Sequence, residues 1–84
     1  MNAIHYLQQV AKEPCTTRTL VAQGILWAEQ SCRIDGTMAM ALRRADASKA
    51  RELLTQAICA GCETMADAQR WLNENREQVL GVLQ

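Results

Sequence analysis

The sequence has little of several residue types on which particular functions depend. It contains one proline, four glycines, one histidine and no phenylalanine. With a single histidine, no glycine-rich phosphate loop and no nucleophile motif, the residues do not favour an enzyme or a cofactor site. The sequence has no run of 18 apolar residues, which is about the length that a transmembrane helix needs. The first residues also lack the basic start and apolar core of a signal peptide. We therefore expect a non-catalytic, cytoplasmic protein without a cofactor or a membrane partner.

An excess of charge of one sign is also missing. Nine basic residues balance nine acidic ones, so no overall field draws the chain onto nucleic acid or an anionic membrane. A composition that is 49% hydrophobic and 21% charged is too apolar for disorder. A chain of 84 residues hides about two-thirds of the surface that its unfolded form exposes. We expect residues 1–84 to fold as a single domain without room for a large buried active site.

What the chain does have is apolar residues at spacings of three and four, the period of an α-helix. This spacing predicts helices over about 2–13, 17–32, 37–45, 48–60 and 65–83, of which the last is the longest. No segment alternates apolar and polar residues long enough to indicate a strand. The predicted fold class is all-α, as a compact bundle of four or five short helices with a longer C-terminal helix.

Residues that begin or end helices give the boundaries. Proline, glycine and the hydroxyl and carboxylate side chains that cap helices mark each change of element. The expected stops and starts are Pro14, Thr16 or Thr17, Asp35 with Gly36, Asp46 or Ser48, Gly61, and Thr64 with Asp67 as a capping box.

The stretch ICAGCE places Cys59 and Cys62 three positions apart, a spacing seen in zinc and redox sites. Zinc needs four ligands, but Cys15 and Cys32 are single and distant in the sequence. A reactive pair puts its nucleophilic first cysteine at a helix N-terminus, whereas Cys59 falls at a C-terminus. We interpret the stretch as a helix junction with reduced thiols, and keep a zinc-stabilised domain as a minor alternative.

Residues suited to binding a partner are concentrated in the expected C-terminal helix. Read as heptads, its apolar residues form a seam that Asn75 interrupts, and such an asparagine can fix the register of paired helices. Tryptophan is a frequent interface anchor, and methionines make adaptable contact surfaces. The same spacing also fits packing inside the bundle. The residues predicted to bind a partner are Trp71, Leu72, Asn75, Val79, Leu80, Leu83, Met38 and Met40.

The sequence therefore predicts a module that binds a protein partner, or a second copy of itself, through an apolar helical surface. Small chains of this type are common among inhibitors and accessory factors of phages and other mobile elements. The alternative is a helix-turn-helix regulator formed by helices near 48–60 and 65–83. In it Arg43, Arg44 and Lys49 contact phosphates, and Gln69, Arg70 and Asn73 contact bases. The neutral charge of the chain favours the protein partner over nucleic acid.

Overall fold

The computed structural model describes residues 1–14 and 16–84, and these residues form six α-helices. The helices are α1 (Ala3–Ala11), α2 (Thr17–Gln30), α3 (Gly36–Arg44), α4 (Ala47–Cys59), α5 (Met65–Glu74) and α6 (Arg76–Leu83). The described residues hold no strand, so the prediction of an all-α fold is confirmed. The number of helices is one more than the four or five expected. None of the helices described is long and apolar enough to cross a bilayer.

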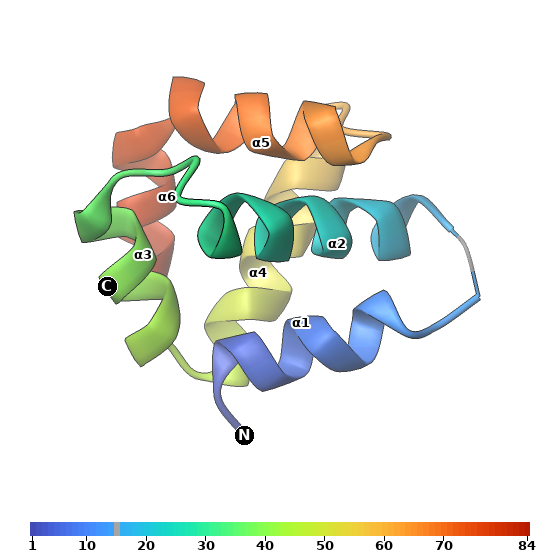
Figure 1. Cartoon of the computed structure of the whole chain (residues 1–84), viewed down its shortest axis with the longest axis horizontal. Coiled ribbons are helices and arrows are strands. Elements are labelled where there is room, and N and C mark those ends of the chain that lie inside the picture. The colour runs from blue at the N-terminus through green and yellow to red at the C-terminus, as the bar shows by residue number, and fades with distance from the viewer. Residues whose placement is uncertain (15) are drawn as a thin grey trace.

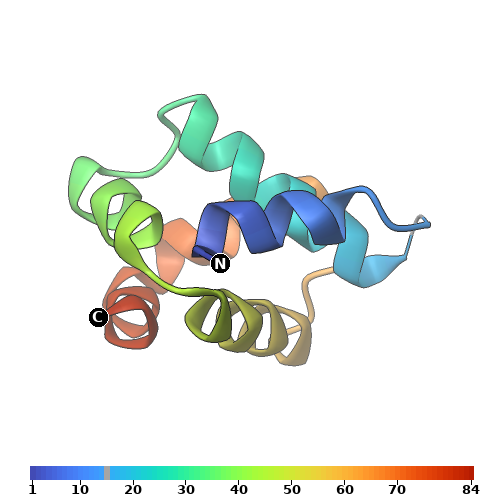
Figure 2. The same cartoon turned by 90° about the horizontal axis from the view of Figure 1, so that it is seen from below.

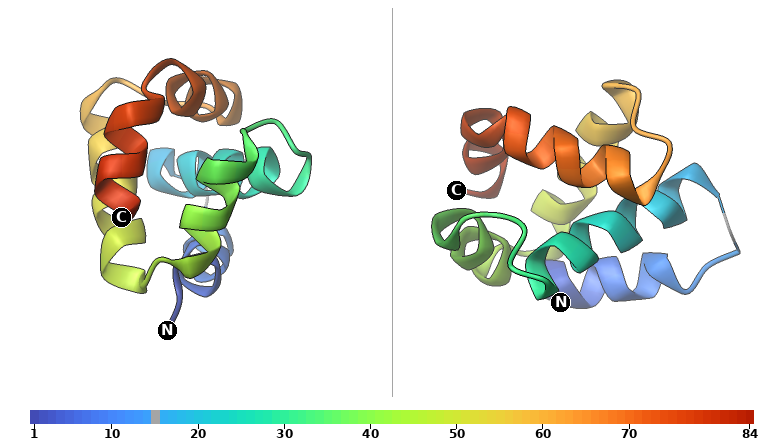
Figure 3. Two further views of the ribbon diagram at one scale, coloured as in Figure 1. Left: turned by 90° about the vertical axis from the view of Figure 1, so that its left-hand side faces the viewer. Right: turned by 45° about the horizontal axis from the view of Figure 1, so that its top comes forward.

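Helix α2 lies at the centre of the arrangement. In Figure 1 it runs between α1 and α5, and α4 crosses behind it. The view from below in Figure 2 shows α4 beside α1, on the side away from the loop that joins α2 to α3. Helices α3 and α6 close one end of the molecule, where they lie side by side (Figure 3). The apolar side chains of all six helices meet in one core, which is built mainly of leucine, alanine, valine and isoleucine.

Close packing of α5 on α2 depends on Gly24, which is buried in the middle of α2. A Cβ atom at this position would lie 2.6 Å from the backbone oxygen of Met65 and 2.9 Å from the Cβ of Ala68. Only glycine therefore allows the two helix backbones to approach this closely. The central location of α2 explains its broad apolar arc, because α2 buries residues against α1 on one side and against α5 on the other.

Side chains cap the N-termini of five helices, and three of these caps, Thr16, Asp46 and Thr64, are among those that the sequence indicates. The side chains of Asn2, Thr16, Asp35, Asp46 and Thr64 each accept a hydrogen bond from the backbone N–H three residues further on. Each cap satisfies one of the N–H groups that a helix start leaves without a partner. The predicted new start at Asp46 and the capping box of Thr64 with Asp67 are confirmed.

Helices α2 and α4 end in the same hydrogen-bonded motif but with different residues at its left-handed position. In α4, Gly61 has a φ of 99°, and Cys62 N–H donates to Ala57 O at 3.1 Å. In α2, Cys32 has a φ of 56°, and Arg33 N–H donates to Ala28 O at 2.8 Å. Both are Schellman motifs, which favour glycine because a Cβ is strained at positive φ.

Exchanging the residue type at these two positions should change stability in opposite directions. We expect Cys32→Gly to raise the free energy of unfolding by about 0.5–1 kcal/mol and Gly61→Ala to lower it by about 1 kcal/mol. A Cβ at Gly61 would meet nothing within 4 Å, so the loss isolates backbone strain. Urea unfolding followed by circular dichroism measures both. A Cys32→Gly variant less stable than the parent would contradict this interpretation.

The C-terminal helix is not the single long helix that the sequence predicts. The helix breaks at Asn75, whose φ of −120° and ψ of 38° are not helical, and the longest helix is α2 with 14 residues. Trp71 O, in the last turn of α5, accepts both the Asn75 backbone N–H at 2.9 Å and the Asn75 side-chain amide at 3.0 Å. The break lets Val79 and Leu83 of α6 bury themselves against α3 and α4.

The start of α1 is tied by backbone hydrogen bonds to the junction of α3 and α4. Ala3 N–H donates to Ala45 O at 2.9 Å, and Ala47 N–H donates to Met1 O at 3.2 Å. These bonds form an isolated antiparallel bridge between Asn2 and Asp46. The two residues that cap α1 and α4 therefore lie side by side.

Candidate binding groove

The residues predicted to bind a partner do not share an exposed face. Met38, Trp71, Leu72, Val79 and Leu83 are buried in the core, while Asn75 and Leu80 are half-buried. Met40 is the exception, with 44% of its surface exposed.

The expectation of an exposed apolar surface along the C-terminal helix is therefore corrected for most of its residues. The physical reason is the break at Asn75. It directs α5 onto α2 and α6 onto α3 and α4, so each half of the seam packs against a different neighbour. Whether the exposed remainder binds a partner stays a prediction.

Met40 lies in an open groove between α3, α6 and the first turn of α4. The groove has a volume of about 430 Å³ and is lined by Thr37, Met40, Ala41, Arg44, Lys49, Leu83 and Gln84. Met40 is its exposed apolar side chain, Ala41 and Leu83 line it although both are almost fully buried, and Arg44 and Lys49 form its basic part. The left view of Figure 3 faces the side of the molecule on which α3 and α6 lie next to each other.

Local rules explain how the chain builds this groove. In α3 the side chains of Met38, Ala39, Ala41 and Leu42 turn inward, which leaves Met40 and Arg44, one helical turn apart, on the outer face. Asp46 starts α4 and so places Lys49 in its first turn. The Lys49 ammonium group donates to Gln84 O at 3.1 Å, which links the start of α4 to the end of α6.

The basic side chains of the groove differ from their neighbours in what they contact. Arg43 pairs with Glu29 at 2.7 Å. Within the described part of the chain, Arg44 and Lys49 form no ion pair with an aspartate or glutamate side chain. The groove therefore carries positive charge that is not neutralised by contact with an acidic side chain.

Thr37, Ala41 and Gln84 were not predicted as site residues. Thr37 lies three positions before Met40 and could have been found from the helical period alone. Gln84 could not have been found in this way, because only the tertiary fold brings the end of α6 next to Lys49.

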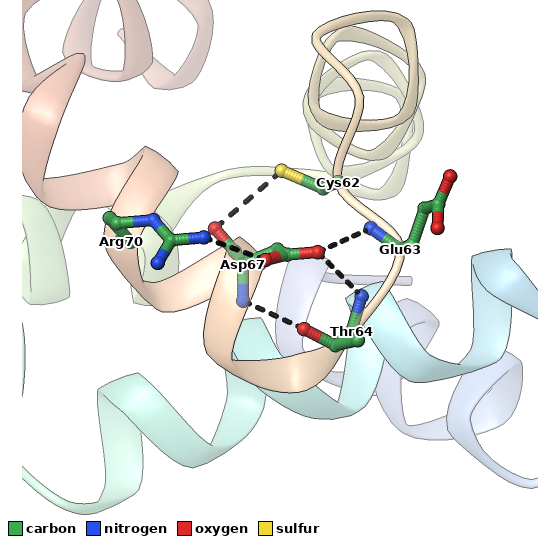
Figure 4. Close-up of polar contacts among 5 residues, drawn as sticks. All are labelled: Cys62, Glu63, Thr64, Asp67 and Arg70. Atoms are coloured by element: carbon green, nitrogen blue, oxygen red, sulfur yellow. Dashed lines mark hydrogen bonds and ion pairs between the residues drawn. The ribbon is translucent and has the colours of Figure 1, made fainter.

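The stretch ICAGCE is a helix junction, as Figure 4 shows. Cys62 is buried, and its thiol donates to Asp67 O at 3.6 Å. Burial, assisted by the negative charge of Asp67, raises the pKa of the Cys62 thiol. A raised pKa disfavours the thiolate that both metal binding and nucleophilic attack require. Cys59, at the last residue of α4, is exposed.

The described residues gather no set of three histidine, cysteine, aspartate or glutamate side chains that could hold a metal ion. Cys32, Cys59 and Cys62 form no disulfide with one another. Cys15, which the zinc hypothesis also needs, lies outside the described residues. Cys59 and Cys62 therefore lack a third ligand within the part of the chain that is described.

The Asp67 carboxylate organises this junction. It accepts hydrogen bonds from Glu63 N–H at 3.0 Å and Thr64 N–H at 3.1 Å, while Thr64 Oγ1 accepts from Asp67 N–H at 3.1 Å. Arg70 pairs with it at 2.7 Å. The hydrogen bond from Glu63 N–H is the largest of the effects that lower the pKa of Asp67 below its ordinary value of 3.8.

A lowered pKa makes the contribution of Asp67 depend on pH. The unfolded chain takes up the proton first as the pH falls, so the stabilisation is fully present above about pH 3.8 and is lost below it. We expect Asp67→Asn to lower the midpoint of thermal unfolding at pH 7, by a difference from the parent that shrinks as the pH drops below 3.8. Thermal melts at pH 3, 5 and 7 test this. A difference that does not vary with pH would contradict it.

The residues predicted to contact DNA are mostly engaged within the chain. Arg43 pairs with Glu29 and Arg70 with Asp67. The Asn73 amide donates to Arg33 O at 3.0 Å and to Gln69 O at 3.1 Å. Helix α5, the expected recognition helix, packs chiefly on α2 and not on α4. Of the six predicted residues, only Arg44 and Lys49 line the groove, while Gln69, Arg70 and Asn73 lie on α5. Binding to DNA stays an untested alternative.

Comparison of the chain with protein-family models, with curated proteins and with solved structures finds no match. The groove is therefore interpreted from its own residues. It combines an exposed methionine, apolar walls on two helices and two basic side chains at one end.

Proposed function

We propose that this protein is a small binding module that holds a segment of a protein partner in the groove between α3 and α6. The observation that carries the proposal is the exposure of Met40, an apolar side chain that remains 44% accessible beside Leu83 in a groove between two helices. Apolar side chains in a concave site favour a ligand that buries apolar surface of its own.

The groove is held in its shape by the core. Met38 and Leu42 of α3 and Leu83 of α6 are buried in the core, which fixes both helices in place. Asp35 caps the start of α3. A preformed site loses less conformational entropy on binding than a mobile one, so more of the contact energy remains as affinity. Met40 itself can change rotamer, which lets the groove adapt to the shape of the bound side chain.

Binding at this site would act by occlusion or bridging. The groove needs to do no more than bury a partner's side chain and exclude the partner from other contacts. One groove of this size holds one or two side chains, so the affinity would rest on a short segment and not on a broad interface.

The experiment is photo-crosslinking in the cells that naturally make the protein. The crosslinking amino acid p-benzoylphenylalanine replaces Thr37 at the edge of the groove, or Gln8 on the exposed side of α1 as a control. We expect a covalent adduct with a protein from position 37, none from position 8, and loss of the adduct when Met40→Asp is added. The Met40→Asp protein must keep its helical circular dichroism.

Adducts of equal yield from positions 37 and 8, or an adduct at position 37 that persists in the Met40→Asp protein, would overturn the proposal. An adduct with twice the mass of the chain would identify the partner as a second copy of the same protein.

A further inference from the structure

We infer, as an extension of the proposed function, that the segment bound in this groove is acidic. It places an apolar side chain against Met40 and a carboxylate against Arg44 and Lys49. The inference rests on the positive charges of the groove, which no aspartate or glutamate side chain of the described residues contacts.

The contrast between two adjacent arginines carries the first step. Arg43 and Arg44 both lie in the last turn of α3, where a positive charge complements the helix dipole. Arg43 is neutralised by Glu29 at 2.7 Å. Arg44 points to the groove and has no carboxylate contact within the described residues. A guanidinium group can bind a carboxylate through two parallel hydrogen bonds, and Arg44 keeps that capacity for a ligand.

Lys49 adds a second cation at the same end. An ammonium group has three hydrogen-bond donors, and the contact of Lys49 Nζ with Gln84 O engages one of them. The carboxylate nearest in sequence, Asp46, caps α4 instead. It accepts hydrogen bonds from Lys49 N–H at 3.1 Å and from the Ser48 hydroxyl at 2.7 Å. The Lys49 ammonium group thus lines the groove without contacting an aspartate or glutamate side chain, and the bond to Gln84 O leaves it further donors.

The spacing of the groove residues limits the form of the ligand. Met40 and Arg44 are four residues apart on one helix, a separation of about 6 Å along its axis. A ligand must therefore carry its apolar and acidic side chains within about one helical turn of each other. A nucleic acid fits less well, because single strands are held by stacking on aromatic rings and none of the residues that line the groove is aromatic.

The test is a selection of random 12-residue peptides displayed on phage, with the intact protein as bait. Phage that bind the Met40→Asp protein are removed first. We expect the selected peptides to be enriched in Asp or Glu within four positions of an apolar residue. In fluorescence anisotropy, the best peptide should bind about tenfold more weakly to the double variant Arg44→Gln with Lys49→Gln. A matched double variant, Lys12→Gln with Arg51→Gln, removes the same charge outside the groove and should bind normally.

The other outcomes would overturn either this inference alone or the proposed function together with it. Peptides that depend on Met40 but show no acidic enrichment would overturn this inference and leave the proposed function standing. If no peptides are selected, both fail. Equal weakening by the two double variants would show attraction to overall charge and overturn the inference. A labelled DNA duplex that binds instead of the peptides, and depends on Arg44 and Lys49, would assign these cations to phosphates and overturn it as well.

Discussion

Replacing Trp71 with alanine should lower the free energy of unfolding by about 3–5 kcal/mol. Only 8% of Trp71 is exposed, and it packs with Ala68 and Leu72 on the face of α5 that meets α2. The loss combines the transfer energy of a large side chain with the cavity it leaves. Since small domains are stable by about 5–15 kcal/mol in total, the variant should be close to unfolding at room temperature. Urea unfolding at 10 °C measures the change.

Trp27 supplies a matched control for this result. It is the other tryptophan of the chain, it is 37% exposed on α2, and the guanidinium of Arg33 lies 5.5 Å from the centre of its ring. We expect Trp27→Ala to cost about 1 kcal/mol at most, since no buried cavity is formed. If Trp71→Ala instead left stability unchanged, Trp71 would be a surface residue, and the sequence-based prediction of a partner site there would regain support.

The second large effect is expected from a single added methyl group. Gly24→Ala should lower the free energy of unfolding by about 1–3 kcal/mol, although alanine is the better helix former by about 1 kcal/mol. The new Cβ would lie 2.6 Å from Met65 O and 2.8 Å from Met65 Cα. These are backbone atoms, so α5 as a whole must move away from α2, and the contacts of its buried side chains weaken.

Gly81 provides the comparison, because it is also helical but sits on the exposed side of α6. A Cβ there would meet nothing within 4 Å, so Gly81→Ala should raise the free energy of unfolding by about 0.5–1 kcal/mol through helix propensity alone. Thermal and urea unfolding of the two variants measure the pair. Two changes of the same sign would show that the α2 and α5 backbones are not in close contact at Gly24.

The parts of the fold that could be predicted from the sequence are those that local chemistry decides. A capping side chain bonds to a backbone N–H three residues away, so Thr16, Asp46 and Thr64 mark helix starts without reference to the rest of the chain. Gly61 marks a helix end for the same reason. The fold class follows from the repeated apolar spacing, which needs no knowledge of how the helices pack.

The break at Asn75 shows where local reasoning fails. The heptad pattern continues through residues 65–82 without a proline or a clear cap, so periodicity predicts one helix. The break is decided by distant residues, since α6 gains burial of Val79 and Leu83 only by turning onto α3 and α4. The one local signal is the polar Asn75 itself, but an asparagine within an apolar seam is also typical of paired helices, so it does not predict a helix end.

The groove could be predicted only in part, for a related reason. Met40 and Arg44 share a helical face and could be placed together from the sequence. Leu83 lies some forty positions away, and no local pattern links it to Met40. That contact exists because two short helices, α3 and α6, are both anchored at the same end of the core.

The bridge between Asn2 and Asp46 affects the order in which the helices unfold. A first helix of nine residues would normally fray, because short helices are marginal alone. Here its opening residues are bonded to the backbone on both sides of Asp46, so α1 cannot be released without also disturbing the start of α4. Loss of either helix start should thus accompany loss of the other. The amide hydrogens of α1 would then exchange with solvent only through openings that include α4, which makes the first helix part of the cooperative unit.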